Sequence, residues 1–546
     1  MLKISRSSSI FIFMLLYHTS TNVQFINGQR PTTFEPLTSS DYCETLQYAL
    51  LFYKYNRAGE LPNNFEIPWR GNSVPQDGDF CNGYFDAGDT VKFVLPMASA
   101  MTMLSFSFLE FERNVEACGL TELFLDDIRH GTDWLMVAHR SPNEMVAQIG
   151  NAKSDHEIWV PPELNNLERP VYWLNPETPG TEVAMEASAA LAAASIVYRT
   201  RDAGYSEKLL QHSKQLHEFA YKYQGNYSEA LPLTERGYYL STSGYNDEIV
   251  WATIWLYRAT GDKKYFDDAK SYYKLYGIGP TSRTNVSMSW DQKSPGSSLL
   301  MAKLTNEPEY HGDIEGYFDN WLPGGVISKT YGGLAHYDDW GSCRYVANTA
   351  FLASVYGDSR YTGFTKQQIN YLLGDNPQHQ SYVVGIGPNF PGALVGGPYL
   401  NGSYSDNRLD FFENEVALDY NAGFVGALAY LVNPKVGDAL TIRRPTPAKD
   451  LHPKLWETDT WLNNEAHQYL STPASPVYIP AATTPPPGMP STTLPGTYPP
   501  TSTAHPSTPT TTDNLPPTTT SYSTSSILNP TTIRNILIGL LLIIIL

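Results

Sequence analysis

The feature that most constrains the fold is a series of helical patterns joined by short loops, which runs through most of the chain between its two ends. In the stretch from Ser206 to Gly225, Ser206 suits an N-cap and Gly225 suits the residue after a helix C-terminus. One face of this stretch carries Leu209, Leu210, Leu216, Phe219 and Tyr223. The pattern predicts an amphipathic helix that ends at a loop.

Further helices are predicted at Glu182 to Thr200, Asp247 to Thr260, Asp262 to Leu275, Tyr345 to Tyr356, Tyr361 to Leu373 and Glu415 to Val432. Short loops between several of them favour antiparallel neighbours, and alternating strand patterns are scarce. We therefore expect an all-α domain over residues 38–434, either a closed toroid of helical hairpins or an open α-solenoid. Loops at one end of such an array form the working surface.

Both ends of the chain carry segments of other kinds. Lys3 and Arg6 precede an apolar run from Ile10 to Tyr17, which is far shorter than the roughly 20 residues that span a bilayer. This layout predicts a signal peptide over residues 1–28 and hence secretion.

The C-terminal part begins with an extension of obscure role at 435–471. A Pro/Thr/Ser-rich stalk follows at 472–526, and an apolar tail fills 527–546. The run from Ile536 to Leu546, at about 1.5 Å per residue, covers roughly half of a 30 Å hydrocarbon core. Small residues, a polar spacer and a short apolar tail favour replacement by a GPI anchor over a tail that is retained.

The net charge and the aromatic content limit the classes of ligand that the protein can be expected to bind. A formal charge of −18 argues against nucleic acid and anionic membrane surfaces, because a polyanion would approach against that field. Aromatic residues make up 13% of the chain, and sugar rings pack their C–H faces on aromatic planes. The composition therefore fits a neutral carbohydrate ligand.

Export would permit disulfides and glycans. Four cysteines allow three pairings, and no CxxC spacing indicates zinc. They are Cys43, Cys81, Cys118 and Cys343. The N-glycosylation sequons predict exposed loops at Asn226, Asn285 and Asn401.

One candidate catalytic segment is NGYFDAGDTVKF at residues 82–93. Asp86 and Asp89 are close enough in this turn to hold and deprotonate one water molecule. The same spacing also suits a helix cap and an Asx-turn, so the spacing alone leaves both interpretations open.

A second candidate segment is YSDNRLDFFENEVALDYNAGF at residues 404–424. Its acids are Asp406, Asp410, Glu413, Glu415 and Asp419. Acids ahead of a helix are commonly dipole partners in water. Glu415, however, lies between Phe411, Phe412 and Tyr420, and apolar surroundings raise a carboxyl pKa toward that of a proton donor.

Together these segments carry a family resemblance. YFDAGDTVKFVLPMA resembles the nucleophilic-water motif of family 9 glycoside hydrolases, and SYSDNRLDFFENEVALDYNAGFVGALA resembles their proton-donor motif. The resemblance extends from about Tyr42 to Leu431 and includes SGYNDEIVWATIWLYRATGD and DWGSCRYVANTAFLA. It implies an (α/α)6 barrel of six helical hairpins and an inverting endo-β-1,4-glucanase acting on cellulose-type β-1,4-glucan.

The resemblance also implies residue roles. Asp89 would be the general base, Asp86 would help to hold the water, Glu415 would be the general acid, and Asp406 would support the donor. In inverting enzymes the two carboxyl groups stand roughly 6.5–9.5 Å apart. The implied sugar-binding residues are His156, Trp159, Tyr245, Trp290, Trp340, Arg344, Tyr345 and Tyr420. No cofactor is expected, a calcium ion is left open because some relatives bind one, and we expect a monomer.

One departure from the family pattern affects function. In the family a proline-rich loop with a Pro-His-His-Arg type motif precedes the GALVGGP segment, whereas here Gly392 follows Pro391 directly. Either the loop was lost or the sequence omits an exon. Three functions remain open: an active glucanase, a glucan-binding protein without turnover, and a stalked glycoprotein without a sugar ligand.

Overall fold

Two concentric sets of helices form the core of the protein. The computed structural model describes residues 36–433 except 66, 68–69, 159, 231–237, 385–391 and 408–409. The inner helices are α3 (Val94–Ala117), α6 (Thr181–Tyr198), α9 (Asn246–Thr260), α12 (Ser294–Thr305), α14 (Ser342–Tyr356) and α17 (Leu418–Leu431). The outer helices are α2 (Ser39–Tyr55), α4 (Thr121–Ala138), α7 (Ala203–Lys222), α10 (Lys263–Leu275), α13 (Pro308–Asp319) and α15 (Ser359–Leu372).

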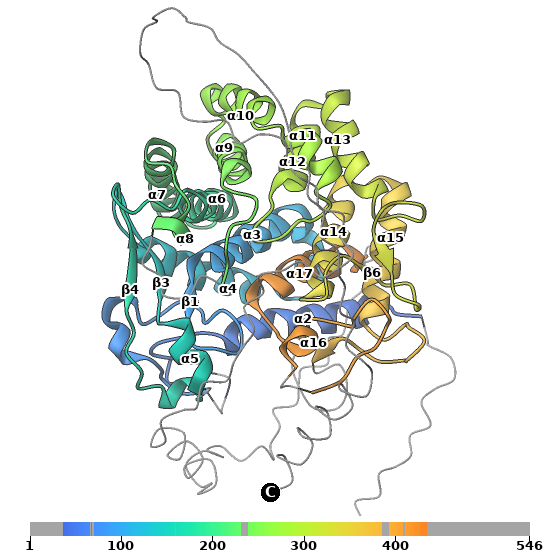
Figure 1. Ribbon diagram of the computed structural model, residues 1–546, viewed down its shortest axis with the longest axis horizontal. Coiled ribbons are helices and arrows are strands. Elements are labelled where there is room, and N and C mark those ends of the chain that lie inside the picture. The colour runs from blue at the N-terminus through green and yellow to red at the C-terminus, as the bar shows by residue number, and fades with distance from the viewer. Residues whose placement is uncertain are drawn as a thin grey trace, which may run out of the picture. The chain divides into compact units, whose positions relative to one another are not determined.

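The inner helices form a closed ring. Each packs against the next in the order α3, α6, α9, α12, α14 and α17, and α17 packs back against α3. Each outer helix packs mainly against one inner helix, and α4, α7 and α15 also contact a second. Outer helices such as α7, α10, α13 and α15 lie at the periphery (Figure 1). The structure is therefore the six-hairpin (α/α)6 barrel rather than the open solenoid.

Burial explains which helices are inner and which are outer. All of α6 except Ile196 is buried, whereas the outer helix α10 buries only Ala269 and Tyr273. Helices that are apolar on every side need neighbours on every side, and amphipathic helices need only one. Among the described residues, α3 alone is apolar and long enough to cross a membrane. Because 83% of its most apolar stretch is buried, α3 is a core helix of the barrel.

Several predicted helix ends are wrong. α7 ends at Lys222 rather than next to Gly225, and α14 begins at Ser342 rather than at Tyr345. Two wrong starts have a structural explanation or affect the site. α7 begins at Ala203 rather than at Ser206, because Asp202 caps it by accepting the N–H of Tyr205. Ser206 lies within the first turn instead and donates to the carbonyl of Ser195. α17 begins at Leu418, so Glu415 precedes this helix instead of belonging to it. The competing caps are chemically equivalent in sequence, and tertiary contacts select between them.

Short strands lie between the helices along the chain. The strands β1 (Lys92–Phe93), β2 (His139–Ser141), β3 (Glu144–Ile149) and β4 (Val171–Leu174) form one antiparallel sheet, in which β1, β2 and β4 all pair with β3. Two further strand pairs are β5 (Ser328–Lys329) with β6 (Ala335–His336) and β7 (Val383–Val384) with β8 (Ala393–Leu394). β1 forms the last two residues of the candidate segment at 82–93, so the sheet fixes the end of that segment.

Short helices complete the loops. They are η1 (Pro75–Phe80), α5 (Ala152–Ile158), η2 (Pro162–Leu164), α8 (Tyr227–Ala230), α11 (Ile278–Thr284) and α16 (Phe411–Asn414). The structure completes none of the three possible pairings of four cysteines but forms one disulfide, Cys43–Cys118, which joins α2 to the end of α3. Cys81 and Cys343 are unpaired. The predicted signal peptide, extension, stalk and tail lie outside the described residues.

Candidate active site

Asp86 and Asp89 lie on the loop between η1 and α3, and both are buried. The N–H of Asp86 donates to the carbonyl of Val91 at 3.2 Å, which closes the loop. The carbonyl of Asp86 accepts the N–H of Leu418 at 3.0 Å, at the start of α17. The two candidate segments, far apart in sequence, are therefore joined directly.

Each of these carboxylates uses one oxygen for a hydrogen bond. The hydroxyl of Tyr239 donates to Asp86 Oδ2, and Asp89 Oδ2 lies 2.8 Å from His156 Nε2. The Oδ1 atoms of Asp86 and Asp89 are both buried and have no hydrogen-bond partner among the described residues. Two carboxylate oxygens thus remain to hold a water molecule.

The electrostatics of the pair are uneven. Burial, and next the charge of Asp89, raise the pKa of Asp86 well above its ordinary value, while the hydrogen bond from Tyr239 opposes the rise. A raised pKa favours the neutral form of Asp86. A neutral Asp86 can orient a water molecule without competing with Asp89 for the proton that the water releases.

Glu415 lies between α16 and α17. Its Oε2 accepts two hydrogen bonds, from Trp340 Nε1 at 2.7 Å and from the Tyr420 hydroxyl at 2.8 Å. Burial raises the pKa of Glu415, whereas these two bonds and the charge of Arg344 lower it. The expected aromatic surroundings are present. Phe411 and Phe412 pack on the ring of Trp340, whose N–H bonds Glu415.

A buried guanidinium supports this side of the site. Arg344 donates to Asp419 at 3.1 Å and to the hydroxyl of Tyr345 at 2.8 Å, and it lies over the ring of Tyr420 at 5.0 Å. The guanidinium therefore fixes the ring whose hydroxyl bonds Glu415. Arg344, Tyr345 and Tyr420 are all buried, so their packing in this structure is internal.

The segment that follows the missing loop, residues 392–398, contacts the chain on both sides of Glu415. Gly397 N–H donates to the carbonyl of Glu413 at 2.8 Å, and Val395 forms a bridge with Val416. Gly397 has a φ of 103°, and a side chain there would meet Cys343 Sγ, so glycine is required. The absent loop falls between β7 and β8, and residues 385–391 lie outside the described residues.

The remaining predicted residues lie in different places. Trp290 packs its ring 4.9 Å from that of Tyr239, on the side of Asp86. Tyr245 precedes α9 and is partly buried against the core. Asp406 is exposed on the loop before α16, and Trp159 lies outside the described residues. The roles assigned to all of these residues stay predictions.

Sequence reasoning did not find Tyr238 and Tyr239. Tyr239 has a φ of 53°, a left-handed conformation that residues other than glycine seldom adopt. Such conformations concentrate at functional sites, and here it accompanies the hydrogen bond to Asp86. In the sequence the two tyrosines are an adjacent pair separated from the SGYNDE segment by Leu240, Ser241 and Thr242, and nothing about the pair marks a site.

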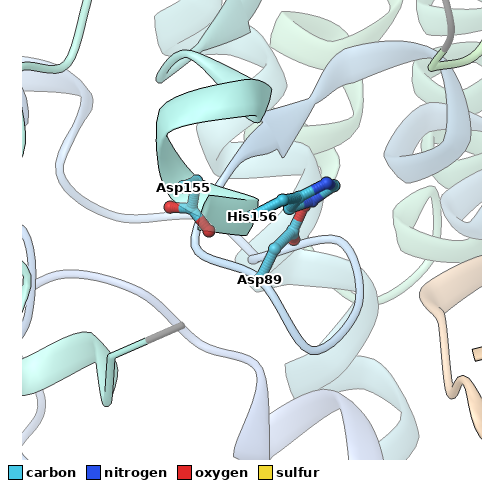
Figure 2. Close-up of side chains that lie close together, drawn as sticks. All are labelled: Asp89, Asp155 and His156. Atoms are coloured by element: carbon cyan, nitrogen blue, oxygen red, sulfur yellow. The ribbon is translucent and has the colours of Figure 1, made fainter. Parts of the chain in front are cut away.

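One cluster has the composition of a metal site. Asp89, Asp155 and His156 each offer a ligand atom, and these atoms lie within 4.8 Å of one another. Figure 2 shows Asp155 and His156 on α5 and Asp89 on the loop beside them. Asp155 already accepts the N–H of Thr90 at 3.1 Å, and both imidazole nitrogens have hydrogen-bond partners. Hydrogen bonds therefore account for this cluster.

Loops of a six-hairpin barrel thus present a buried carboxyl pair, with two oxygens that have no partner among the described residues, and, joined to it, an acid with a raised pKa. That combination defines a glycoside hydrolase of the helical-barrel class. Matches with known proteins narrow the class, because residues 42–391 and 389–428 match Glycosyl hydrolase family 9. The chain belongs to this family.

Individual relatives agree with the family match. The chain is 48% identical over 435 residues to an endoglucanase of Dictyostelium discoideum, a match covering 72% of this chain and 61% of the relative. It resembles the solved endoglucanase of the termite Nasutitermes takasagoensis with a TM-score of 0.67 and 38% identity, over 72% of this chain and 98% of that one. A third match is endoglucanase CelQ of Clostridium thermocellum, complexed with cellobiose and cellotriose, with a TM-score of 0.65 and 35% identity over 71% and 70% of the two chains.

The extent of these matches has two consequences. The chain spans less than two thirds of the Dictyostelium relative, so that relative has parts with no counterpart here. The family match also breaks into two stretches that meet at residues 389–391. This break coincides with the junction at Pro391 and Gly392 where the family's loop is missing.

Proposed function

We propose that the protein is an endo-β-1,4-glucanase that hydrolyses cellulose-type glucans with inversion of configuration. The observation that carries the proposal is the unequal treatment of three carboxyl groups. Glu415 has a raised pKa and bonds through one oxygen, whereas Asp86 and Asp89 each keep a buried oxygen without a partner. One group suits proton donation and the pair suits water activation.

The mechanism follows from these positions. Glu415 donates its proton to the glycosidic oxygen as the bond to the anomeric carbon breaks. A water held by Asp86 and Asp89 attacks the opposite face of that carbon, and its proton passes to Asp89. Single displacement inverts the configuration.

The comparisons support a hydrolase over a binding protein without turnover. The named relatives are endoglucanases, and one solved relative holds cellobiose and cellotriose. The missing loop bears on rate, because a charged contact to the transition state is worth several kcal/mol in a dry site. We therefore propose an active enzyme with a lower turnover than relatives that keep the loop.

The test is hydrolysis of carboxymethyl cellulose by the full-length protein beside its Glu415→Gln variant. We expect release of reducing sugar together with a rapid fall in viscosity, and both should disappear in the variant. Proton NMR of fresh product should show the α-anomer first. Sequencing of the transcript across Pro391 and Gly392 establishes whether the short junction is natural.

Other outcomes would change the proposal. No release from a folded protein with a confirmed junction, together with binding of cellooligosaccharides, would make this a glucan-binding protein. Initial release of the β-anomer would contradict inversion. A fall in viscosity without initial release of the α-anomer would therefore support the glucanase activity while contradicting the inverting mechanism.

The predicted export also belongs to this proposal. We propose a secreted, glycosylated monomer with a GPI anchor. Asn401 is exposed and accepts the N–H of Ser403, so a glycan fits there, whereas Asn226 and Asn285 are half-buried. Mass spectrometry of glycopeptides, phospholipase C release from cells and gel filtration test the three parts separately.

A further inference from the structure

Two adjacent tyrosines reach the two carboxylates of the water-holding pair by different routes. Tyr239 donates directly to Asp86. The hydroxyl of Tyr238 lies 2.9 Å from His156 Nδ1, and His156 Nε2 lies 2.8 Å from Asp89 Oδ2. A single stretch of backbone therefore controls both carboxylates, one of them through an imidazole.

This stretch is firmly anchored. The hydroxyl of Tyr227 donates to the carbonyls of Tyr238 and Tyr239, at 3.2 and 3.0 Å. Tyr227 is buried, and its own N–H donates to Glu182 at 2.8 Å. The Tyr238 ring also meets the His156 ring edge-on, with centroids 4.7 Å apart. The hydroxyl of Tyr238 is thus held at a fixed position against Nδ1.

The hydrogen-bonding rules then restrict the proton on the imidazole. An ionised Asp89 only accepts, so Nε2 must carry a hydrogen to bond with it. A tyrosine hydroxyl can donate to an unprotonated Nδ1 or accept from a protonated one. Tyr238 is therefore compatible with both the neutral Nε2–H tautomer and the imidazolium, and in both states Nε2–H faces Asp89.

We propose that Tyr238 is a positioning residue that acts through His156 on Asp89, and that it reserves Asp89 Oδ1 for the attacking water. Nε2–H occupies one acceptor position of Oδ2, so the oxygen of the base that is left without a hydrogen bond to receive the proton of water is Oδ1. That oxygen is the buried atom without a partner. The inference rests on the proposed hydrolytic function and adds the device that selects one oxygen of the base.

The charges around His156 agree with this arrangement. Asp89, Asp155 and Glu415 face it from three different segments. Burial alone would lower the pKa of His156, but the hydrogen bond and charge of Asp89, followed by the charges of Asp155 and Glu415, raise it. The protonated form therefore stays available as a partner for the ionised base.

A double-mutant cycle tests whether Tyr238 acts through His156. Tyr238→Phe keeps the ring and removes the hydroxyl, so kcat should fall about ten-fold with KM within about two-fold, as for one lost hydrogen bond. His156→Gln should lower kcat further. Adding Tyr238→Phe to His156→Gln should then change little, because the partner is already absent. Tyr331→Phe, at a tyrosine that is 94% exposed, is the matched control and should behave as wild type.

Additive losses in the double variant, or an unchanged kcat in Tyr238→Phe, would overturn the inference. Melting temperatures within a few degrees of wild type show that the variants are folded. The acidic limb of the kcat/KM profile should also move in Tyr238→Phe and stay in Tyr331→Phe. A purely structural role for Tyr238 would leave that limb in place.

A second measurement is independent of activity. In the full-length protein labelled with ¹⁵N-histidine, the His156 signal, identified by its loss in His156→Gln, should show a proton on Nε2 across the pH range. Tyr238→Phe should shift the Nδ1 resonance, because Nδ1 loses the Tyr238 hydroxyl, while the proton stays on Nε2 opposite Asp89. An Nδ1–H tautomer in wild type would refute the inference even if no glucan is hydrolysed, so its failure is distinct from failure of the proposed function.

Discussion

The two sides of the site hold their carboxyl groups in contrasting ways. On the acid side, one oxygen of Glu415 takes both hydrogen bonds, from Trp340 and Tyr420. On the base side, the hydrogen bonds are divided, one to Asp86 and one to Asp89. Doubling the bonds on one oxygen leaves the other to carry a proton, whereas dividing them leaves two oxygens to hold a water.

The scaffolds of the two sides differ as well. The acid follows a four-residue helix and precedes α17, so local chain and an inner helix place it. The base loop depends on distant segments, because its partners come from residues 156 and 239. Substitutions on the acid side should therefore impair protonation of the leaving group, and substitutions on the base side should impair activation of water. The size of the loss in activity should also differ between the two sides.

The largest effects are expected at Glu415 and Asp89. Glu415→Gln and Asp89→Asn should each lower hydrolysis of carboxymethyl cellulose by about 10³-fold or more, since each removes a proton-transfer group. An aryl β-cellobioside with a dinitrophenol leaving group separates them. That leaving group needs no proton, so Glu415→Gln should retain most activity on it while Asp89→Asn should not.

Equal losses in both variants on the activated substrate would break the comparison. Such a result would assign Glu415 to the base side or to substrate binding. Asp406→Asn is an informative companion, because Asp406 is exposed and its supporting role is a prediction. A loss below about two-fold would remove Asp406 from the catalytic group.

The next effect is expected at Tyr239. Tyr239→Phe removes the donor to Asp86 and leaves both oxygens of that buried carboxyl without a partner, which raises the pKa of Asp86 further. We expect kcat to fall about 10- to 100-fold on both carboxymethyl cellulose and the activated substrate. An effect confined to carboxymethyl cellulose would place Tyr239 with the acid instead.

The contrast also explains what the sequence could predict. Glu415 and Tyr420 are five residues apart, so the donor segment itself contains an acid and a hydrogen-bond partner. The Tyr239 contact spans 153 residues and depends on a left-handed φ at a residue that is not glycine. Nothing local marks such a position, whereas helical periodicity marked seven of the twelve helices of the barrel.

Ring closure shows the same limit at the level of the fold. The apolar patterns predicted helical hairpins, but closure requires α17 to pack on α3, and that contact joins opposite ends of the domain. The family resemblance supplied the closed barrel. Individual helix ends depend on the choice between neighbouring caps, which packing decided at Asp202 and Ser206.

A smaller effect is expected from Trp340→Phe on the acid side. Phenylalanine keeps an aromatic ring beside Phe411 and Phe412 but loses the N–H that bonds Glu415 Oε2. That bond lowers the pKa of Glu415, so its loss raises the pKa of the acid. The alkaline limb of kcat/KM should move to higher pH, with kcat within about ten-fold of wild type. A shift of the acidic limb instead would show that Trp340 acts on the base.

The smallest effect concerns stability, and it arises beneath the base side. Burial raises the pKa of Glu182 to about 8, and Glu182 accepts the N–H of Tyr227, which anchors the tyrosine pair. A raised pKa means that the folded protein holds a proton which the unfolded chain, with a pKa of about 4.3, has released. The resulting stability is complete below the unfolded value and is lost as the pH rises through about 8.

Glu182→Gln keeps an acceptor for Tyr227 and has no proton to lose, so its melting temperature should vary less with pH than that of wild type. The wild-type melting temperature should fall relative to the variant between pH 5 and pH 9. Glu207→Gln, at an exposed position on α7, is the matched control and should track wild type. Parallel curves for wild type and Glu182→Gln would mean that Glu182 is ionised in the fold. In that case Glu182 would not make the melting temperature depend on pH. Any loss of stability at alkaline pH on the base side would then have to come from Asp86 and Asp89 themselves.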